Sequence, residues 1–368
     1  MFTSQNNNKK NLYFMKLALN QAQKNLGNTK ENPSVGCVIV KNGHLIATGY
    51  TGFNGRPHAE INAISSTKDN LINTSMYITL EPCSHYGKTP PCVNTIIKKK
   101  IKKVFFSVKD PDKRSFNKSK KILLKNKVTV RIGHLSNELN KFYKSYYKYK
   151  KNLALPFVTS KLAVSKDYLT INKKKKWITN VSSRSRVHLI RSFHDCILTT
   201  SKTIIKDNPL LTCRIKGLEY KSPTRIVLDK NLSISINSQI IKTSKSNSTI
   251  LFYNKTNTSK ILTFKKKKIK LYKVSLNKDG NLDLKQLLEK LKNLGFSRVL
   301  VEAGEKLTSS LLSENLVDQF DLFVSSKKLN ENGDKSIKKY FGTYLKNKKY
   351  TYQKVNLFGD KMYSYRLK

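Results

Sequence analysis

The sequence predicts an α/β protein of two domains. Its 368 residues exceed the usual size of a single domain, and each half is long enough to bury its own core. Short apolar strand candidates alternate with helical stretches along the whole chain. A basic segment, residues 148–155, ends at Pro156. We therefore expect one domain over residues 1–150 and a second over residues 151–368.

The first domain is expected to open with a helix over residues 12–26, where apolar residues recur at helical spacing. Asn42-Gly43 lies between two apolar segments and is a pair typical of type I′ hairpin turns. The expected strands are residues 35–40, 44–49, 76–80, 104–108 and 128–132, and the further helices are residues 92–100 and 137–149.

The second domain shows the same alternation, without an internal repeat or a motif shared with the first. Its expected strands are residues 157–162, 196–200, 224–228, 249–252 and 298–302, and its expected helices are residues 182–192, 283–293 and 307–314.

The net charge of +49 would ordinarily suggest a nucleic-acid partner. Only ten of the 72 basic residues are Arg, however, whereas readout of bases and bidentate contacts with phosphate favour Arg. The Lys residues are spread through the whole chain in short runs. We therefore interpret them as solvated surface side chains and expect no specific nucleic-acid partner.

Five cysteines, an odd number, argue against a framework of disulfides and for a reducing compartment, so we expect a cytoplasmic protein. The first ten residues are polar and lack the apolar core of a signal peptide. No apolar run approaches the roughly 20 residues that span a bilayer, and no membrane role is expected.

The strongest chemical signal is His58-Ala59-Glu60, followed by Pro82-Cys83 and Pro91-Cys92. One imidazole and two thiolates predict a single Zn²⁺ per chain, with His58, Cys83 and Cys92 as ligands and the fourth position open for water. Zinc lowers the pKa of that water, and Glu60 is the carboxylate that would transfer protons. This order of residues is the signature of zinc nucleobase deaminases, in which hydroxide displaces ammonia from a ring carbon.

The alternative interpretation is that these are unrelated buried residues. Against it, a proline precedes both His58 and Cys92, and each pair opens a helical pattern, so both ligands would lie at helix N-termini. Cys37 and Cys196 lie within apolar strands and are expected to be ordinary core residues, and Cys213 has no assigned role.

Eight residues separate the two cysteine ligands, whereas cytidine-type and transfer-RNA-type deaminases usually have two. The segment Thr79–Cys92 closely resembles that of the pyrimidine deaminases of riboflavin biosynthesis, and residues 32–40 resemble their N-terminal segment. The resemblance implies a cytidine-deaminase-like fold and a contact between Asn32 and the substrate ring. His85 could contact the substrate or support a ligand, or serve as a fourth ligand, and Lys88 could bind the substrate phosphate or remain solvated.

No G-x-G-x-x-G motif follows a strand in the second domain, so an ordinary Rossmann fingerprint is absent. Residues 298–307 indicate a strand, a tight turn and a helix start that could bind a phosphate through free backbone N–H groups. An ordinary strand-to-helix loop is the alternative.

Resemblance to the reductase half of the bifunctional riboflavin enzymes rests on Trp177-Ile178-Thr179, residues 197–203 and residues 207–214. It implies a dihydrofolate-reductase-like fold that uses NADPH. The residues matching its cofactor contacts are Val164, Trp177, Thr203, Asp207, Lys230, Gly304, Glu305, Lys306 and Leu307. Those matching its substrate contacts are Lys175, Arg191, Leu211, Arg214 and Glu302. The two arginines suit a phosphorylated sugar, with surface ion pairs as the alternative.

Three residues depart from the family pattern. Tyr168 follows Ser165-Lys166-Asp167 where relatives carry Gly, and it would obstruct a turn that requires positive φ. Lys175 replaces a substrate-contacting Ser in a loop that is two residues short, and Lys230 replaces a cofactor-contacting Ser. These differences leave open a second domain without reductase activity.

The resemblance implies a riboflavin-pathway enzyme that acts on a phosphorylated pyrimidine. The first domain would deaminate 2,5-diamino-6-(5-phosphoribosylamino)pyrimidin-4-one, and the second would reduce its ribosyl group to ribityl with hydride from NADPH. A homo-oligomer is possible. The alternatives are a nucleoside or transfer-RNA deaminase with an unrelated second domain, and a zinc-stabilised nucleic-acid-binding protein.

Overall fold

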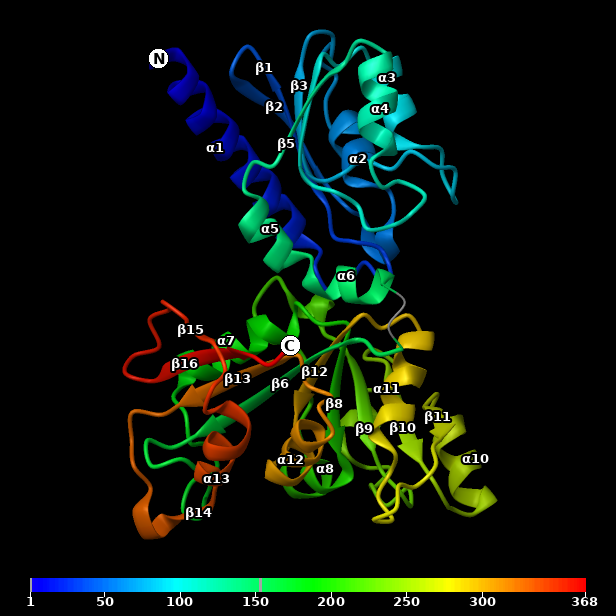
Figure 1. Ribbon diagram of the computed structural model, residues 1–368. Coiled ribbons are helices and arrows are strands. Elements are labelled where there is room, and N and C mark those ends of the chain that lie inside the picture. The colour runs from blue at the N-terminus through cyan, green and yellow to red at the C-terminus, as the bar shows by residue number, and fades with distance from the viewer. Residues whose placement is uncertain (1, 152–153) are drawn as a thin grey trace. The chain divides into compact units, whose positions relative to one another are not determined.

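The computed structural model describes residues 2–151 and 154–368, and the chain divides into two compact units, Met1–Leu153 and Ala154–Lys368 (Figure 1). Each unit is built around its own sheet. Within the described residues, no helix is both long and apolar enough to cross a bilayer.

The first unit contains a five-stranded sheet in the order β2-β1-β3-β4-β5. β1 pairs antiparallel with β2 and with β3, and β3, β4 and β5 run parallel. The strands are β1 (Gly36–Lys41), β2 (His44–Tyr50), β3 (Ser75–Leu80), β4 (Lys103–Val108) and β5 (Thr129–Ile132).

Helices cover both faces of this sheet, with α1 on one face and α2, α3 and α4 on the other (Figure 1). The helical elements are α1 (Phe2–Lys24), the 3₁₀ turn η1 (Phe53–Gly55), α2 (Ala59–Ser65), α3 (Cys92–Lys98), α4 (Lys118–Lys125), α5 (Ser136–Phe142) and α6 (Lys144–Lys150). Because both faces are covered, the inner strands β1, β3 and β4 are nearly continuous buried runs, and β3 buries Met76 to Leu80 completely or nearly so.

The second unit contains a nine-stranded sheet in the order β11-β10-β9-β8-β12-β6-β13-β16-β15. The first seven strands of this order, which end with β13, run parallel to one another. β16 then pairs antiparallel with β13, and β15 pairs antiparallel with β16. β14 and β7 form a separate antiparallel pair. The strands are β6 (Phe157–Val164), β7 (Leu169–Asn172), β8 (Cys196–Thr200), β9 (Thr224–Leu228), β10 (Thr249–Tyr253), β11 (Lys270–Lys273), β12 (Arg298–Glu302), β13 (Gln319–Val324), β14 (Gly333–Ser336), β15 (Tyr350–Tyr352) and β16 (Lys361–Arg366).

Two apolar cores lie on opposite faces of this large sheet. Along β8, Cys196 and Leu198 pack with residues of α11 and α12, whereas Ile197 packs with residues of α7, α9 and α10. The helical elements are α7 (Val181–Arg191), α8 (Ser201–Asp207), η2 (Glu219–Lys221), α9 (Gln239–Lys242), α10 (Thr258–Lys266), α11 (Leu284–Asn293), α12 (Glu305–Ser313), η3 (Asn330–Asn332), α13 (Lys338–Tyr340) and the π-helical η4 (Phe341–Leu345).

The structure corrects two predicted helices. The first begins at Phe2 rather than at residue 12, because its polar first turns carry no apolar periodicity that a sequence pattern could detect. The helix expected over residues 137–149 is divided at Tyr143 into α5 and α6. The ring of Tyr143 is buried there, and its hydroxyl bonds to the hydroxyl of Thr79 in the sheet.

Tyr168 does not obstruct the turn between β6 and β7, contrary to expectation. It adopts the left-handed conformation with φ of 66°, and its N–H donates to the carbonyl of Ser165 at 3.0 Å. The carboxylate of Asp167 accepts hydrogen bonds from the backbone N–H groups of Leu329 and Asn330. These contacts offset the roughly 1–2 kcal/mol that a left-handed non-glycine residue costs.

Gly49 sets how closely α2 approaches β2. A Cβ atom at this position would lie 2.3 Å from the carbonyl oxygen of Ala59 and 2.3 Å from the nitrogen of Ala63, both backbone atoms of α2. These backbone atoms cannot move aside as a flexible side chain would, so any side chain here would displace the whole helix.

We therefore predict that Gly49→Ala lowers the free energy of unfolding by about 1–3 kcal/mol, the usual cost of overpacking. The measurement is chemical denaturation of the full chain. Ser65→Ala, at an exposed position of α2, is the matched control and should change the value by less than about 0.5 kcal/mol. Equal stability of the two variants would show that α2 is not held against Gly49.

Candidate functional site: a metal centre and a cationic cluster

Three donor atoms from distant parts of the first unit converge on one point. The Nδ1 atom of His58 lies 3.3 Å from the Sγ of Cys92 and 3.5 Å from the Sγ of Cys83, and all three donors are within 4.8 Å of one another. Tetrahedral zinc with its usual bond lengths requires a nitrogen-to-sulfur separation of about 3.5 Å. The donor set therefore fits zinc in both its chemistry and its spacing.

Local structure places each donor. His58 is the N-cap of α2 and Cys92 is the first residue of α3, so both helices begin at the metal site. Cys83 follows the end of β3, and its sulfur accepts the backbone N–H of Cys92 at 3.2 Å. Hydrogen bonding from Cys92 contributes most to lowering the pKa of Cys83, to about 4. The thiolate that a metal requires is therefore favoured at Cys83, whereas the hydrogen bond to Cys83 raises the pKa of the Cys92 thiol well above its usual value.

Glu60 lies in the first turn of α2, two residues after His58, and is buried. Burial raises the pKa of its carboxyl to about 7. A carboxyl group with a pKa near neutrality can both accept and release a proton, which is the property that general acid–base catalysis requires.

The surrounding loops contain side chains that the sequence interpretation did not single out. Arg56 places its guanidinium 3.1 Å from the Nε2 of His58 and donates a hydrogen bond to the hydroxyl of Thr89. His85 pairs through Nδ1 with the hydroxyl of Ser115 at 2.9 Å, and it is outside the group of described residues that could hold a metal. Proximity in space, not sequence spacing, identifies Arg56 and Ser115.

Asn32 packs against Gly55 in the loop that leads to His58. Gly55 has φ of 87°, and a Cβ atom on it would lie 2.2 Å from the side-chain amide of Asn32. The predicted substrate residue is thus held beside the metal-binding loop. Lys88 is exposed on the loop between the two cysteines, where no described contact fixes it.

In the second unit, the predicted cofactor residues follow the carboxyl ends of parallel strands. Val164 ends β6, Thr203 follows β8, Lys230 follows β9 and Gly304 follows β12. The chain passes from β6 to β8 and returns later to place β12 between them. Such a change of winding direction leaves a crevice at the carboxyl ends, where ligands of α/β sheets bind.

The N-terminus of α12 is suited to a phosphate. Gly304 is its N-cap and provides no side-chain cap, and a Cβ atom at Gly304 would meet nothing within 4 Å. The first turn of an α-helix leaves backbone N–H groups without acceptors inside the helix, so the start of α12 is a position where a phosphate could bind.

The remaining predicted cofactor residues are less closely grouped. Asp207 is the last residue of α8 and is exposed. Trp177 is half exposed, and the guanidinium of Arg184 stacks on its ring with 4.9 Å to the centroid. The ammonium of Lys230 donates to the carbonyl of Gly280 at 2.6 Å, and Lys175 is an exposed residue of the loop before α7.

Three of the predicted substrate residues, Arg191, Arg214 and Glu302, belong to a cationic cluster. Arg191 binds the carboxylate of Glu302 bidentately, with Nε 2.6 Å from one oxygen and a terminal nitrogen 3.0 Å from the other. Lys161, which the sequence interpretation did not single out, lies 3.8 Å from Glu302. The pKa of Glu302 falls to about 2, because the attraction of Arg191 and Lys161 outweighs the effect of burial.

Arg214 joins this cluster through His188, since its guanidinium lies 3.2 Å from the Nε2 of that ring. Leu211, in the same loop, is buried in the left-handed conformation with φ of 55°. A bulky residue rarely adopts this conformation, and such strain is concentrated at functional sites. The cluster therefore contains three cations and one carboxylate, an excess of positive charge suited to an anion.

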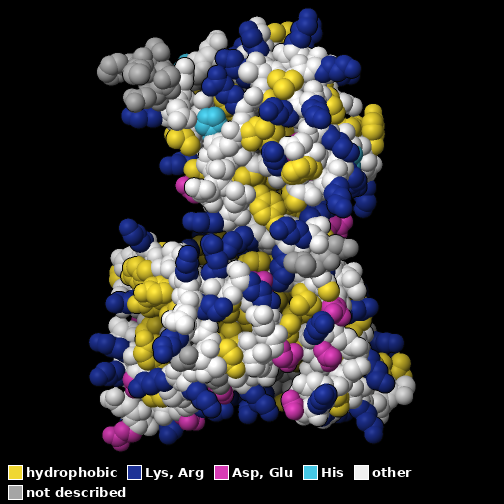
Figure 2. Space-filling view, viewed as in Figure 1, with side chains coloured by type: hydrophobic (Ala, Val, Ile, Leu, Met, Phe, Trp, Pro, Cys, Tyr) yellow, Lys and Arg dark blue, Asp and Glu magenta, His cyan; other side chains and the backbone are white. Residues whose placement is uncertain are grey.

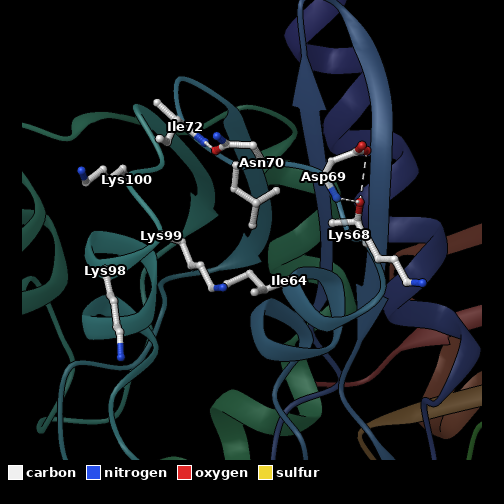
Figure 3. Close-up of a pocket in the computed structure, with 10 residues that line it drawn as sticks. Ile64, Lys68, Asp69, Asn70, Ile72, Lys98, Lys99 and Lys100 are labelled. Carbon is white, nitrogen blue, oxygen red and sulfur yellow. Dashed lines mark hydrogen bonds between the residues drawn. The ribbon is translucent and has the colours of Figure 1, made fainter.

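A separate hollow of about 340 Å³ lies in the first unit, lined by residues 64, 67–72 and 98–100 (Figure 3). The side chains of Lys98, Lys99 and Lys100 border it (Figure 3). None of the metal donors or predicted substrate residues lines it.

The fold and the donor geometry of the first unit define a site of the zinc-dependent deaminase class. The second unit is an α/β unit whose largely parallel sheet is of the kind that binds ligands at the carboxyl ends of its strands. Comparisons with known proteins agree. Residues 8–108 match the cytidine and deoxycytidylate deaminase zinc-binding region, and residues 156–361 match the RibD C-terminal domain.

Similar proteins cover both units. Riboflavin biosynthesis protein RibD of Aquifex aeolicus is 33% identical over 320 residues, 86% of this chain and 87% of that protein. RibD of Escherichia coli is 30% identical over 86% of this chain and 88% of its own length. The solved diaminohydroxyphosphoribosylaminopyrimidine deaminase/5-amino-6-(5-phosphoribosylamino)uracil reductase of Thermotoga maritima has a TM-score of 0.83 at 28% identity. That match covers 98% of this chain and 100% of the other.

The chain belongs to the RibD family of riboflavin biosynthesis proteins, which are deaminase/reductases. The expected family, the fold of each domain and the enzyme class are confirmed, as are zinc and NADPH as the cofactors of this type of enzyme. The alternative of an unrelated second domain was wrong, because the RibD C-terminal domain matches residues 156–361.

We predict that Cys83→Ser and Cys92→Ser each lose most of the bound zinc, because a hydroxyl is a poor substitute for a thiolate. The measurement is metal content of the purified chain. Cys37→Ala is the matched control, since Cys37 is buried in β1 and outside the group of donors, and it should retain one zinc per chain. Full zinc content in both serine variants would reject the site.

Proposed function

We propose that this chain deaminates 2,5-diamino-6-(5-phosphoribosylamino)pyrimidin-4-one in its first unit and reduces the ribosyl group of the product in its second. The observation that carries the proposal is the convergence of His58, Cys83 and Cys92 beside the buried Glu60. The deaminase and reductase activities of the Thermotoga maritima relative support the choice of substrate.

In the deamination, bound zinc would supply Lewis acidity that lowers the pKa of water. Glu60 would accept the proton of the attacking water and deliver it to the leaving amino group, which departs as ammonia. Asn32, held beside Gly55, would orient the ring, and His85, held by Ser115, would line the same site.

In the reduction, Arg191 and Arg214 would bind the substrate phosphate, and Glu302 would fix the orientation of Arg191 through its bidentate pair. Leu211 would contact the sugar-bearing part of the substrate from its strained position. The NADPH pyrophosphate would lie at the N-terminus of α12, with the residues from Gly304 to Leu307 as donors.

The remaining cofactor contacts are proposed from the family resemblance. Val164, Trp177, Thr203, Asp207 and Lys230 would bind NADPH along the carboxyl ends of the strands, and Lys175 would approach the substrate from the loop before α7. The turn at Tyr168 is formed, so it gives no reason to assign the second unit a merely structural role.

We further propose that the partners are small molecules, that the compartment is reducing and cytoplasmic, and that the chain can form homo-oligomers. Lys and Arg side chains are dispersed over the visible face of each unit and do not gather in one patch (Figure 2). Such dispersion favours weak, salt-sensitive attraction to nucleic acids over a specific complex. All five cysteines are free, as a reducing compartment requires.

Glu60→Gln should keep zinc and the fold but lower the rate of ammonia release by about 10²- to 10⁴-fold, since the general acid–base group is removed while the ligands remain. The assay measures ammonia and zinc content on the same preparation. Glu138→Gln, at an exposed position of α5, removes the same charge and should retain the normal rate. A Glu60→Gln variant within about twofold of the unmodified chain would reject the assigned role.

Arg214→Ala should raise the KM of the deaminated substrate in NADPH oxidation by about 10- to 150-fold, the range for loss of a charge-assisted hydrogen bond. Ammonia release should be unchanged, because the deaminase residues lie in the other unit. Lys216→Ala removes a positive charge from an exposed position two residues away and serves as the control. An unchanged KM in Arg214→Ala would contradict the phosphate contact.

A further inference from the structure

His188 lies between the two arginines of the cationic cluster. It precedes Arg191 by three residues on α7, so both side chains project from the same face of the helix. Its Nδ1 atom is 2.9 Å from the carbonyl oxygen of Thr212, and its Nε2 atom is 3.2 Å from the guanidinium of Arg214. The ring thus bridges the helix, the loop and Arg214.

These contacts define one tautomer. Arg214 can only donate, so Nε2 must carry the lone pair and Nδ1 the hydrogen, which it donates to Thr212. Two donors also lie near Nδ1, the backbone N–H of Arg214 at 3.3 Å and a terminal nitrogen of Arg191 at 3.5 Å. The other tautomer, however, would leave two donors facing each other at Nε2 and a lone pair facing the carbonyl oxygen of Thr212. The Nδ1–H tautomer therefore satisfies the two shorter contacts.

The ring must also be uncharged to hold this position. Half-burial, together with the positive charges of Arg191 and Arg214, lowers the pKa of His188 to about 4. A neutral imidazole is the form of histidine that can accept from a guanidinium. It adds no repulsion to a cluster that already contains Lys161, Arg191 and Arg214 and a single carboxylate.

His188 contacts the loop that carries the predicted substrate residues Leu211 and Arg214. The carbonyl of Thr212 accepts from His188 and also from Arg191 at 2.9 Å. On its other side, the buried guanidinium of Arg225 donates to the carbonyl of Leu210 at 3.2 Å. Arg214, in contrast, is an exposed residue of this loop. Within the described residues, His188 supplies the side-chain acceptor for its guanidinium.

We propose that His188 is a positioning residue of the reductase site, which holds the guanidinium of Arg214 toward the substrate phosphate through the lone pair on Nε2. The inference rests on the proposed function, since it assumes that Arg214 binds that phosphate. His188 acts through Arg214, because it lowers the number of orientations that the guanidinium samples before the substrate arrives.

Two near-isosteric substitutions separate positioning from packing. Gln places a carbonyl oxygen near the position of Nε2 and so retains the acceptor for Arg214. Asn places an amide near Nδ1 and retains the donor to Thr212 but loses that acceptor. We expect His188→Asn to raise the KM of the deaminated, phosphorylated substrate by about tenfold with kcat nearly unchanged, and His188→Gln to stay within about threefold.

The decisive measurement is the same pair of substitutions in an Arg214→Ala background, with NADPH oxidation by the full chain as the assay. If His188 acts through Arg214, His188→Asn should add no further increase in KM there. A further tenfold increase, or equal impairment by Gln and Asn, would overturn the positioning role. An unchanged KM for His188→Asn beside a raised KM for Arg214→Ala would overturn this inference alone and leave the proposed function standing.

Discussion

The deaminase site depends on the start of two helices at one point beside the end of β3. α2 begins at His58 and α3 at Cys92, and the loop after β3 supplies Cys83 between them. The position of α2 is set in turn by Gly49, which lets the helix backbone meet the sheet without an intervening side chain. A metal donor, a buried acid and a close helix–strand contact are therefore parts of one arrangement.

In the reductase unit, the corresponding constraint is the excess of positive charge in the partly buried cationic cluster around Glu302. Lys161 and Glu302 are paired across neighbouring strands of the sheet, and Arg191 reaches the same carboxylate from α7. One buried carboxylate orients the cations without neutralising them all. A neutral imidazole at His188 extends the cluster toward the exposed Arg214 without adding charge. The site can thus be organised before an anionic ligand binds.

The sequence predicted several of the strands that are buried on both faces, although it missed β13, whose residues from Phe320 to Phe323 are buried. The strands at residues 196–200 and 298–302 coincide with β8 and β12, because burial on both faces makes them continuous apolar runs. The edge strand β15 was not predicted, since its three residues are exposed and carry no alternation. Lys161, His188 and Arg56 were also missed, because their roles arise from strand register and helix packing that local patterns do not specify.

The account as a whole claims that one chain performs two successive reactions on one phosphorylated pyrimidine. The most direct test is to incubate the purified, zinc-loaded full chain with the diaminopyrimidine substrate, with and without NADPH, and to identify the products by mass. We expect only the deaminated ribosyl compound without NADPH, and the deaminated ribityl compound when NADPH is present. A substrate that keeps its amino group under both conditions would contradict the account.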